Sequence, residues 1–319
     1  MGKIKFVLFL LFLAFYISQG LAQTAGRYLI YLSDKQNSPY TVDNPRVYLS
    51  QRAIDRRIKS QISVTEEDFP VNPQYVQQIK ALGAQVIFTS RWLNTVTIDD
   101  PDQNLITNIQ ALPFVLGVER RSAGLKTGVI DKFSEELIDT SLYGYAKHQI
   151  EMMNGFVLHN LNFRGKGVRI AVLDAGFANV NILPAFDSIR LSGRIIGTWD
   201  FVTNDPEVYI DHPHGTQVLS LMAANLPNSF IGTSPDASYW LLRTEDAQTE
   251  TPSEEDNWVA AAEFADSAGA DIITSSLGYS SFDYPFASHT YTDCDGSTAH
   301  ISIAAYKAAR KGILVLNSA

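Results

Sequence analysis

The stretch Val168-Arg169-Ile170-Ala171-Val172-Leu173-Asp174-Ala175-Gly176 decides the fold class. The run before Asp174 is almost entirely apolar, which is typical of a strand buried on both faces of a sheet. In open α/β sheets, ligands bind beyond the carboxyl ends of the strands, so Asp174 is a candidate site residue. The alternative is that this aspartate only caps the turn that follows it.

Short apolar runs of the same kind recur along the rest of the chain. They alternate with segments of helical periodicity, and this alternation predicts an α/β fold with a parallel sheet and helices on both faces. The expected strands cover residues 168–173, 194–199, 238–242, 271–274 and 313–316, and the expected helices cover residues 216–224, 254–268 and 298–311.

A different pattern occupies the N-terminal part of the chain. Its elements follow the order strand, helix, hairpin, helix, strand, which predicts a small α+β domain of the ferredoxin-like, split βαβ type. Asn72 is the expected N-cap of the first helix, Pro73 lies in its first turn and Gly83 follows its end. The expected strands are 28–32, 85–89, 93–98 and 114–118, and the expected helices are 73–82 and 102–112.

The first residues have the layout of a secretory signal peptide. Lys3 and Lys5 precede an apolar run over residues 6–17, and Gly20-Leu21-Ala22 follows. The run is too short for a membrane span, which needs roughly 20 residues. We therefore expect a secreted protein, extracellular or periplasmic, with this domain order: signal peptide 1–22, α+β domain 23–121, polar linker 122–146 and α/β domain 147–319.

Composition excludes several classes of protein. A chain of 319 residues that is 45% hydrophobic can bury a core, so it is not disordered as a whole. Twenty-five basic against 34 acidic residues give a net charge of -9, which argues against a nucleic-acid partner. One cysteine cannot form an internal disulfide or a cysteine-built zinc site. After the signal peptide is removed, no stretch predicts a membrane contact.

A second candidate site residue stands at the start of a helix. His214-Gly215-Thr216 opens the expected helix 216–224, which is apolar almost all round and is therefore buried. A buried helix would hold the histidine on a rigid element, as general acid–base catalysis requires. The alternative is a histidine that serves as a cap or a hydrogen-bonded core residue.

Three segments together resemble, in their order and spacing, signatures of the subtilisin-like serine proteases: Asp174 in residues 170–176, His214 in residues 214–218, and Ser275-Ser276-Leu277-Gly278. The resemblance implies that Asp174 orients and stabilises the imidazole of His214, and that His214 activates a serine and protonates the leaving amine. It also implies that Ser276, Leu277 and Gly278 offer backbone to an extended protein or peptide substrate. No cofactor is required, and a structural calcium ion is compatible with the resemblance.

The sequence departs from the family pattern at two places. Ala175 stands where the family usually has serine or threonine. The family's Gly-Thr-Ser nucleophile motif on a late helix and its oxyanion asparagine are not found, so we expect both beyond Ala319 and interpret the chain as a truncated, inactive fragment. Ser234 lies in a Gly-Thr-Ser triplet but before a sheet strand, and Asn317 comes too early to be the oxyanion residue.

The N-terminal domain resembles the family's propeptide, which implies a folding template and a temporary intramolecular inhibitor; an accessory domain is the alternative. Three functions stay open at this point. They are a secreted serine endopeptidase, a non-catalytic peptide-binding protein that keeps the groove, and a metal-dependent hydrolase that uses His212, His214 and Asp174. His148 and His159 are expected at the surface.

Overall fold

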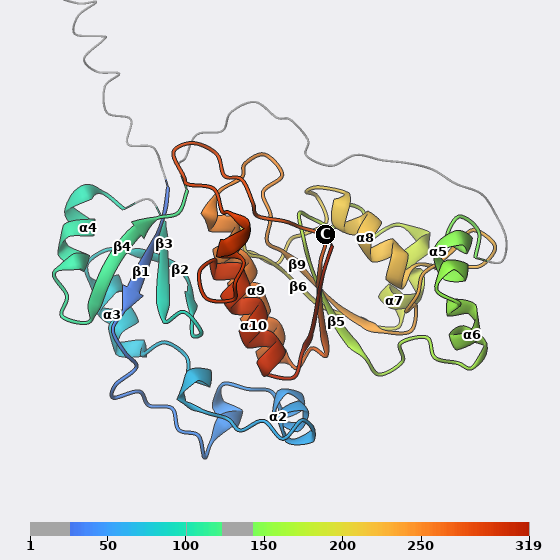
Figure 1. Ribbon diagram of the computed structural model, residues 1–319, viewed down its shortest axis with the longest axis horizontal. Helices are drawn as coiled ribbons and strands as arrows, with labels where there is room; N and C mark the ends of the chain where they lie inside the picture. The colour runs from blue at the N-terminus through green and yellow to red at the C-terminus, as the bar shows by residue number, and fades with distance from the viewer. Residues whose placement is uncertain (1–25, 100, 123–142, 319) are drawn as a thin grey trace, which may run out of the picture.

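The computed structural model describes residues 26–99, 101–122 and 143–318. The expected signal peptide and most of the expected linker lie outside the described residues. The described chain forms a four-stranded sheet, a five-stranded sheet and a small two-stranded sheet. Figure 1 shows the four-stranded, N-terminal sheet beside a pair of long helices that separates it from the larger sheet.

The N-terminal unit has the predicted order of strands and helices. Its four-stranded sheet has the order β2-β3-β1-β4, and neighbouring strands are antiparallel. Asn72 caps the first of the predicted helices by accepting a hydrogen bond from the Gln74 N–H, as expected. The elements are β1 (Arg27–Leu32), α3 (Pro73–Ala81), β2 (Gln85–Ser90), β3 (Thr95–Asp99), α4 (Gln103–Gln110) and β4 (Val115–Arg120).

One helix of this unit was not predicted. Helix α2 (Gln51–Lys59) lies between β1 and α3, with 3-10 turns η1 (Pro45–Val47) and η2 (Glu66–Asp68) on either side. Its N-cap Ser50 accepts from the Ala53 N–H. The helix was missed because its apolar residues at helical spacing are few, Ile54 and Ile58, and because its buried residues are one alanine and two arginines.

The larger sheet is parallel throughout and has the order β11-β10-β5-β9-β6. Its strands confirm the predicted α/β class. All of the strand ends lie within one residue of the expected bounds. The strands are β5 (Arg169–Asp174), β6 (Ile195–Asp200), β9 (Ser238–Arg243), β10 (Ile272–Ser275) and β11 (Leu314–Asn317).

Helices cover both faces of this sheet, as predicted. On one face, α8 (His214–Ala223) and α7 (Asp187–Leu191) pack in a core with Ile170, Val172 and Leu241. On the other face, α9 (Pro252–Ala268) and α10 (His300–Arg310) pack in a core with Ala171, Leu173 and Leu242. Alternate residues of each strand enter opposite cores, because successive side chains point to opposite faces. The remaining elements are α5 (Lys147–Met152), α6 (Gly155–Asn160), η3 (Pro184–Phe186), β7 (Asn225–Leu226), β8 (Phe230–Ile231) and η4 (Tyr291–Asp293).

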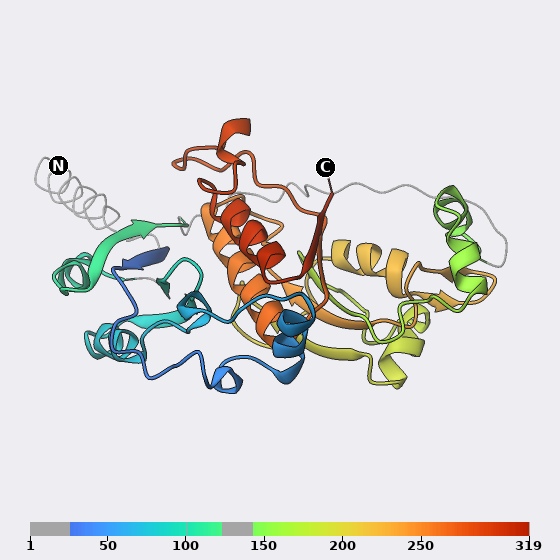
Figure 2. The same ribbon diagram turned by 60° about the horizontal axis from the view of Figure 1, so that its bottom comes forward.

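Helices α9 and α10 also support the N-terminal sheet, and Figure 2 shows them between the two sheets from a second direction. Trp92, from the β2–β3 connection, enters the core that α9 and α10 share with the larger sheet. Arg27 donates to the Asn257 side chain of α9 at 2.7 Å. The two units are therefore packed against each other through α9 and α10.

Two further findings concern exposure. His159 was expected at the surface, but it is buried, and its Nε2 lies 2.9 Å from the Thr233 carbonyl oxygen. That hydrogen bond to a distant loop could not be read from the amphipathic pattern of its own segment. Over residues 26–99, 101–122 and 143–318, no helix is long and apolar enough to cross a membrane.

Candidate active site

Asp174 and His214 meet at the carboxyl edge of the parallel sheet. Asp174 is the last residue of β5, which lies at the centre of the sheet, and its side chain is fully buried. His214 is the first residue of α8, and 16% of its side chain is exposed. Its Nδ1 lies 2.8 Å from Asp174 Oδ1, so the ring is held by one nitrogen while the other, Nε2, can act as a base.

Two glycines allow helix α8 to approach β5 this closely. A Cβ on Gly215 would lie 2.3 Å from the Gly176 carbonyl oxygen and 2.9 Å from Asp174 Cβ. Gly176 itself has a φ of +149°, and a Cβ there would lie 2.6 Å from the His212 nitrogen. Thr216 then donates to the Ala178 carbonyl at 2.7 Å and ties the helix start to the segment after β5. The Asp174–His214 distance therefore depends on backbone contact that side chains would prevent.

The two carboxylate oxygens of Asp174 differ in their hydrogen bonding. Its Oδ1 accepts from the Ala175 N–H at 2.7 Å and from His214, while its Oδ2 is buried with no hydrogen-bond partner among the described residues. Burial raises the pKa of Asp174, and the hydrogen bond and charge of His214 and the Ala175 N–H oppose this rise. Ala175, at the family's usual hydroxyl position, offers no side-chain donor to this carboxylate.

The expected substrate-binding segment begins at the same edge of the sheet. Strand β10, which neighbours β5, ends at Ser275, so Ser276, Leu277 and Gly278 lie directly beyond the strand. Leu277 is buried and Gly278 is exposed. The last residue of the strand, Ser275, pairs with Leu173 of β5 and with Asn317 of β11. The role of residues 276–278 in binding a substrate stays a prediction.

The three ligands of the metal-dependent alternative are not brought together. His212 lies beside His214, and its Nδ1 accepts from the His214 N–H at 3.2 Å, but the two rings are 6.4 Å apart between centroids. Within the described part of the chain, the only group of three metal-ligating side chains is formed by Glu245, Glu250 and Glu254. The metal-dependent alternative therefore has no geometric support.

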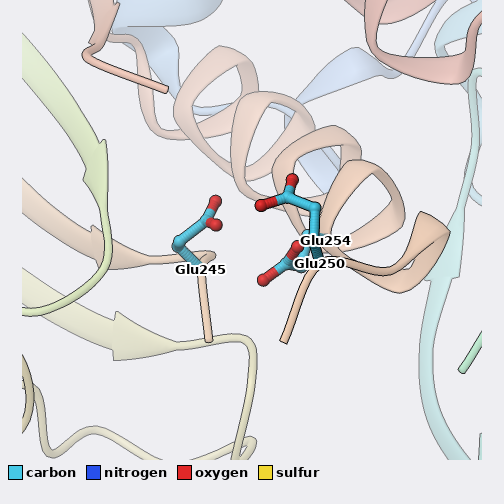
Figure 3. Close-up of side chains that lie close together, drawn as sticks. All are labelled: Glu245, Glu250 and Glu254. Carbon is cyan, nitrogen blue, oxygen red and sulfur yellow. The ribbon is translucent and has the colours of Figure 1, made fainter. Parts of the chain in front are cut away.

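The three glutamates were not singled out from the sequence, because they come from a loop after β9 and from the start of α9. Figure 3 shows their carboxylates turned toward one another, and their ligand atoms lie within 4.8 Å. Carboxylates of this kind suit calcium, but Glu254 already accepts from the Thr251 and Asp246 N–H groups, and Glu245 accepts from the Tyr279 hydroxyl. These bonds give the group a structural role, and a structural calcium ion stays a prediction.

Ser234 lies far from the histidine. Its backbone N–H donates to the Met222 carbonyl near the end of α8, whereas His214 begins that helix. Eight helical residues at 1.5 Å each separate the two ends by about 12 Å. The Ser234 hydroxyl is therefore outside the reach of His214, as the position of its triplet before a strand indicated.

Comparisons with known proteins match both units of the chain. Residues 165–319 match the family model described as "Subtilase family", and residues 27–133 match the model described as "Peptidase S8 propeptide domain, Bacteroidota". The two matches follow the order in which the sequence resemblance placed a propeptide and a protease domain.

Several curated proteins are similar to part of the chain. Thermitase of Thermoactinomyces vulgaris is 34% identical over 119 residues, which cover 36% of this chain and 38% of that protein. Subtilisin E of Bacillus subtilis (strain 168) is 30% identical over 152 residues, which cover 46% of this chain and 35% of that protein. The chain thus spans well under half the length of these relatives.

Solved structures show the same fold. Fervidolysin from Fervidobacterium pennivorans, described as a keratinolytic enzyme related to subtilisin, aligns with a TM-score of 0.51 at 15% identity, over 93% of this chain and 40% of that one. The epidermin leader peptide processing serine protease of Staphylococcus aureus (S393A mutant) aligns with a TM-score of 0.51 at 14% identity, over 93% and 61%. At such low sequence identity, these alignments are evidence for the fold alone.

Proposed function

The chain belongs to the subtilase family, and we propose that it is part of a secreted serine endopeptidase whose acid–base pair is Asp174 and His214. The observation that carries the proposal is the 2.8 Å contact between His214 Nδ1 and the buried Asp174 Oδ1. A carboxylate at Nδ1 holds the ring in one tautomer and stabilises the imidazolium ion that forms during acyl transfer.

The chemistry follows from that arrangement. His214 Nε2 accepts the proton of a serine hydroxyl as the serine oxygen attacks the carbonyl carbon of the scissile peptide bond. The imidazolium then gives this proton to the leaving amine, and the bond from carbon to nitrogen breaks. A water molecule then attacks the carbonyl carbon of the acyl-enzyme while His214 accepts its proton. His214 returns this proton to the serine oxygen as the ester bond breaks. Asp174 keeps its charge throughout.

The nucleophile and the oxyanion donor of this proposal lie in the part of the relatives' length that this chain does not span. The chain covers 38% of thermitase and 35% of subtilisin E, so most of each relative has no counterpart here. In the protein as proposed, a serine hydroxyl would come within hydrogen-bond reach of His214 Nε2.

The substrate of the proposed enzyme is a protein or peptide in extended conformation. Residues 276–278 continue from β10 at the same sheet edge as Asp174, and Gly278 is exposed there. An extended peptide could add to this segment through main-chain hydrogen bonds. The proposal needs no metal or organic cofactor for the reaction.

The N-terminal unit is proposed to act as propeptide and intramolecular inhibitor. The match of residues 27–133 to a propeptide family and the packing of the unit on α9 support this role. We place the propeptide at residues 23–121, the linker at 122–146 and the protease domain from 147 onward, with residues 1–22 as a secretory signal.

Replacement of His214 by alanine in the full-length protein tests the proposal. We expect kcat/KM for peptide hydrolysis to fall by about 10⁴-fold or more, with the fold retained, because the general base is lost. His148→Ala, which alters an exposed histidine of the same unit, is the matched control and should leave kcat/KM unchanged. Equal activity of the His214→Ala protein and the control would contradict the assignment of His214 as the base. Absence of hydrolysis in the unaltered protein and in the control would favour a peptide-binding protein without catalysis.

A further inference from the structure

The N-terminal unit contacts helix α9 along its whole length, mainly through charged side chains. At the start of α9, Arg121 Nε lies 2.7 Å from Asp256. Further along, Glu263 accepts from the Ser90 hydroxyl and from the Arg91 and Trp92 N–H groups of the β2–β3 turn. All of these contacts are made by residues at or just after the ends of strands of the unit's four-stranded sheet.

A separate element of the unit contacts the end of α9. Helix α2 presents Arg56 and Arg57 there, and both side chains are buried. Arg57 Nη2 bridges Asp68 of its own unit and Asp266 of α9, each at 2.8 Å. Arg56 pairs with the other oxygen of Asp266. Arg91 of the β2–β3 turn also lies 2.6 Å from Asp266. Asp266 has no exposed surface, so its charge is balanced by arginines from both α2 and this turn.

Arg56 also binds the backbone at the ends of two helices. It donates to the Lys311 carbonyl after α10 at 3.1 Å, to the Ala270 carbonyl after α9 at 2.6 Å, and to the Asp266 carbonyl at 3.2 Å. The last carbonyls of a helix lack partners within the helix and carry the negative end of its dipole. One planar guanidinium therefore satisfies carbonyls at the ends of both α9 and α10.

Arg52 repeats this type of contact one turn earlier on α2. It donates to the Gly269 carbonyl at 3.0 Å and to the Gly167 carbonyl at 2.8 Å, and it pairs with Asp271. Gly269 is the C-cap of α9, and Gly167 precedes β5. The helix α2 thus binds the turns that lead into β5, β10 and β11.

These contacts lie at the opposite edge of the sheet from Asp174. Helices α9 and α10 end where β10 and β11 begin, whereas Asp174 lies where β5 ends. Figure 1 shows α2 near the far ends of α9 and α10, away from the C-terminus at the carboxyl edge.

We propose that α2 is a second docking element of the N-terminal unit. It binds the C-terminal ends of α9 and α10 through the guanidinium groups of Arg52, Arg56 and Arg57, and it holds the unit on the protease domain in addition to the contacts along α9. The acceptor surface consists of backbone carbonyls with Asp266 and Asp271, and its ligand is the arginine-bearing helix α2. The proposal deepens the propeptide role, because it names a surface by which the two units recognise each other.

Charge pairs of the reverse sense, with the cations on or directly after α10 and the anions on the N-terminal unit, add to this contact. Lys311, after α10, lies 3.1 Å from Asp68 of the N-terminal unit, and Lys307 of α10 pairs with Glu67. Each unit therefore supplies both cations and anions. A lysine in place of Arg56 would keep the charge, but it could not reach the same set of carbonyls with a planar fork of donors.

Hydrogen exchange in the 319-residue chain tests the proposal, and it needs no catalytic activity. In Arg56→Gln, exchange should rise by about tenfold or more in α2 and in the last turns of α9 and α10, because these are held by the lost guanidinium. Protection of β1–β4 should stay within about twofold of the unaltered chain. Lys59→Gln, an exposed position in the same helix, is the control and should change neither region.

Arg52→Gln provides a milder second variant, since 37% of the Arg52 side chain is exposed and its loss leaves Asp266 paired. It should raise exchange in α2 and around Gly269 by a smaller factor. Unchanged exchange of α2 in both variants would overturn the proposal. Equal loss of protection in α2 and β1–β4 would also overturn it, because α2 would then belong to one cooperative docking unit. The propeptide role is tested by inhibition of hydrolysis and could fail while this exchange pattern holds.

Discussion

The carboxylate of Asp174 combines two properties that a catalytic aspartate needs. It is fully buried, and one of its oxygens is held by His214 and the Ala175 N–H. Its second oxygen has no hydrogen-bond partner among the described residues. The ionised form is therefore stabilised on one side only, and burial raises the pKa of Asp174.

We predict that Gly215→Ala lowers activity by about 10²-fold, because an added Cβ would push α8 away from Gly176 and Asp174 and displace His214 by a fraction of an ångström or more. The measurement is kcat/KM for peptide hydrolysis in the full-length protein. Gly117→Ala is the control, since a Cβ at Gly117 meets nothing within 4 Å. Full activity of Gly215→Ala would show that close approach of α8 and β5 is not required.

The raised pKa of Asp174 predicts how Asp174→Asn changes stability with pH. Below the ordinary value of 3.8 the aspartate is neutral in both states, and as pH rises through the raised folded-state pKa its ionisation destabilises the native protein. Asp174→Asn should therefore increase the free energy of unfolding by about 1 kcal/mol at pH 7, and less toward pH 4, while abolishing most activity. Urea unfolding at a series of pH values measures this, and a variant that is less stable at pH 7 would contradict it.

Sequence reasoning could find the site residues that lie next to a clear apolar pattern in the chain. Asp174 ends an apolar run and His214 begins an apolar helix, so both could be placed at element ends. Arg56 and Glu263 could not be found, because their partners are about two hundred residues away in the sequence. His159 was misplaced for a similar reason, because its hydrogen-bond partner Thr233 is 74 residues away in the sequence.

Among the elements, those with an apolar stripe could be predicted and those with a charged buried face could not. Strand β5 and helix α8 follow the patterns expected for buried elements. Helix α2 buries arginines, and its helical start is marked only by the N-cap Ser50. Strand β10 ends at Ser275, one residue after its expected end.

We predict that the contact of Asp68, in the turn after α2, with Arg57 of α2 and Lys311 after α10 is sensitive to acid. Burial alone would raise its pKa, but the Thr65 N–H, Arg57 and Lys311 outweigh burial and lower the pKa below the ordinary 3.8. Its ionised form therefore stabilises the folded chain above that value, and this contribution is lost as pH falls through the lowered pKa.

Asp68→Asn should lower the free energy of unfolding by about 3 kcal/mol at pH 7, because Arg57 and Lys311 keep buried charges without this partner. The difference from the unaltered chain should shrink as pH falls below about 4. Asp43→Asn, at an exposed position of the same unit, should have little effect. A constant difference at all pH values in urea unfolding would show that the carboxylate charge is not responsible.

At the scale of the whole molecule, α9 and α10 serve two sheets. One side of α9 packs in the core of the parallel sheet, and acidic residues on its other side receive the N-terminal unit. The fold class and the division into two units could be predicted from hydrophobic periodicity. Their mode of docking could not, because it depends on charge pairs between distant parts of the chain.

Labelling with a serine-directed fluorophosphonate tests most directly whether Asp174 and His214 activate a serine nucleophile. We predict that the full-length protein is labelled on one serine, that His214→Ala abolishes labelling, and that the 319-residue chain is not labelled, since its Ser234 is held about 12 Å from His214 along α8. Mass spectrometry of the labelled peptide identifies the serine. Labelling that persists in His214→Ala, or that occurs at Ser234 in the 319-residue chain, would contradict the assignment of this pair.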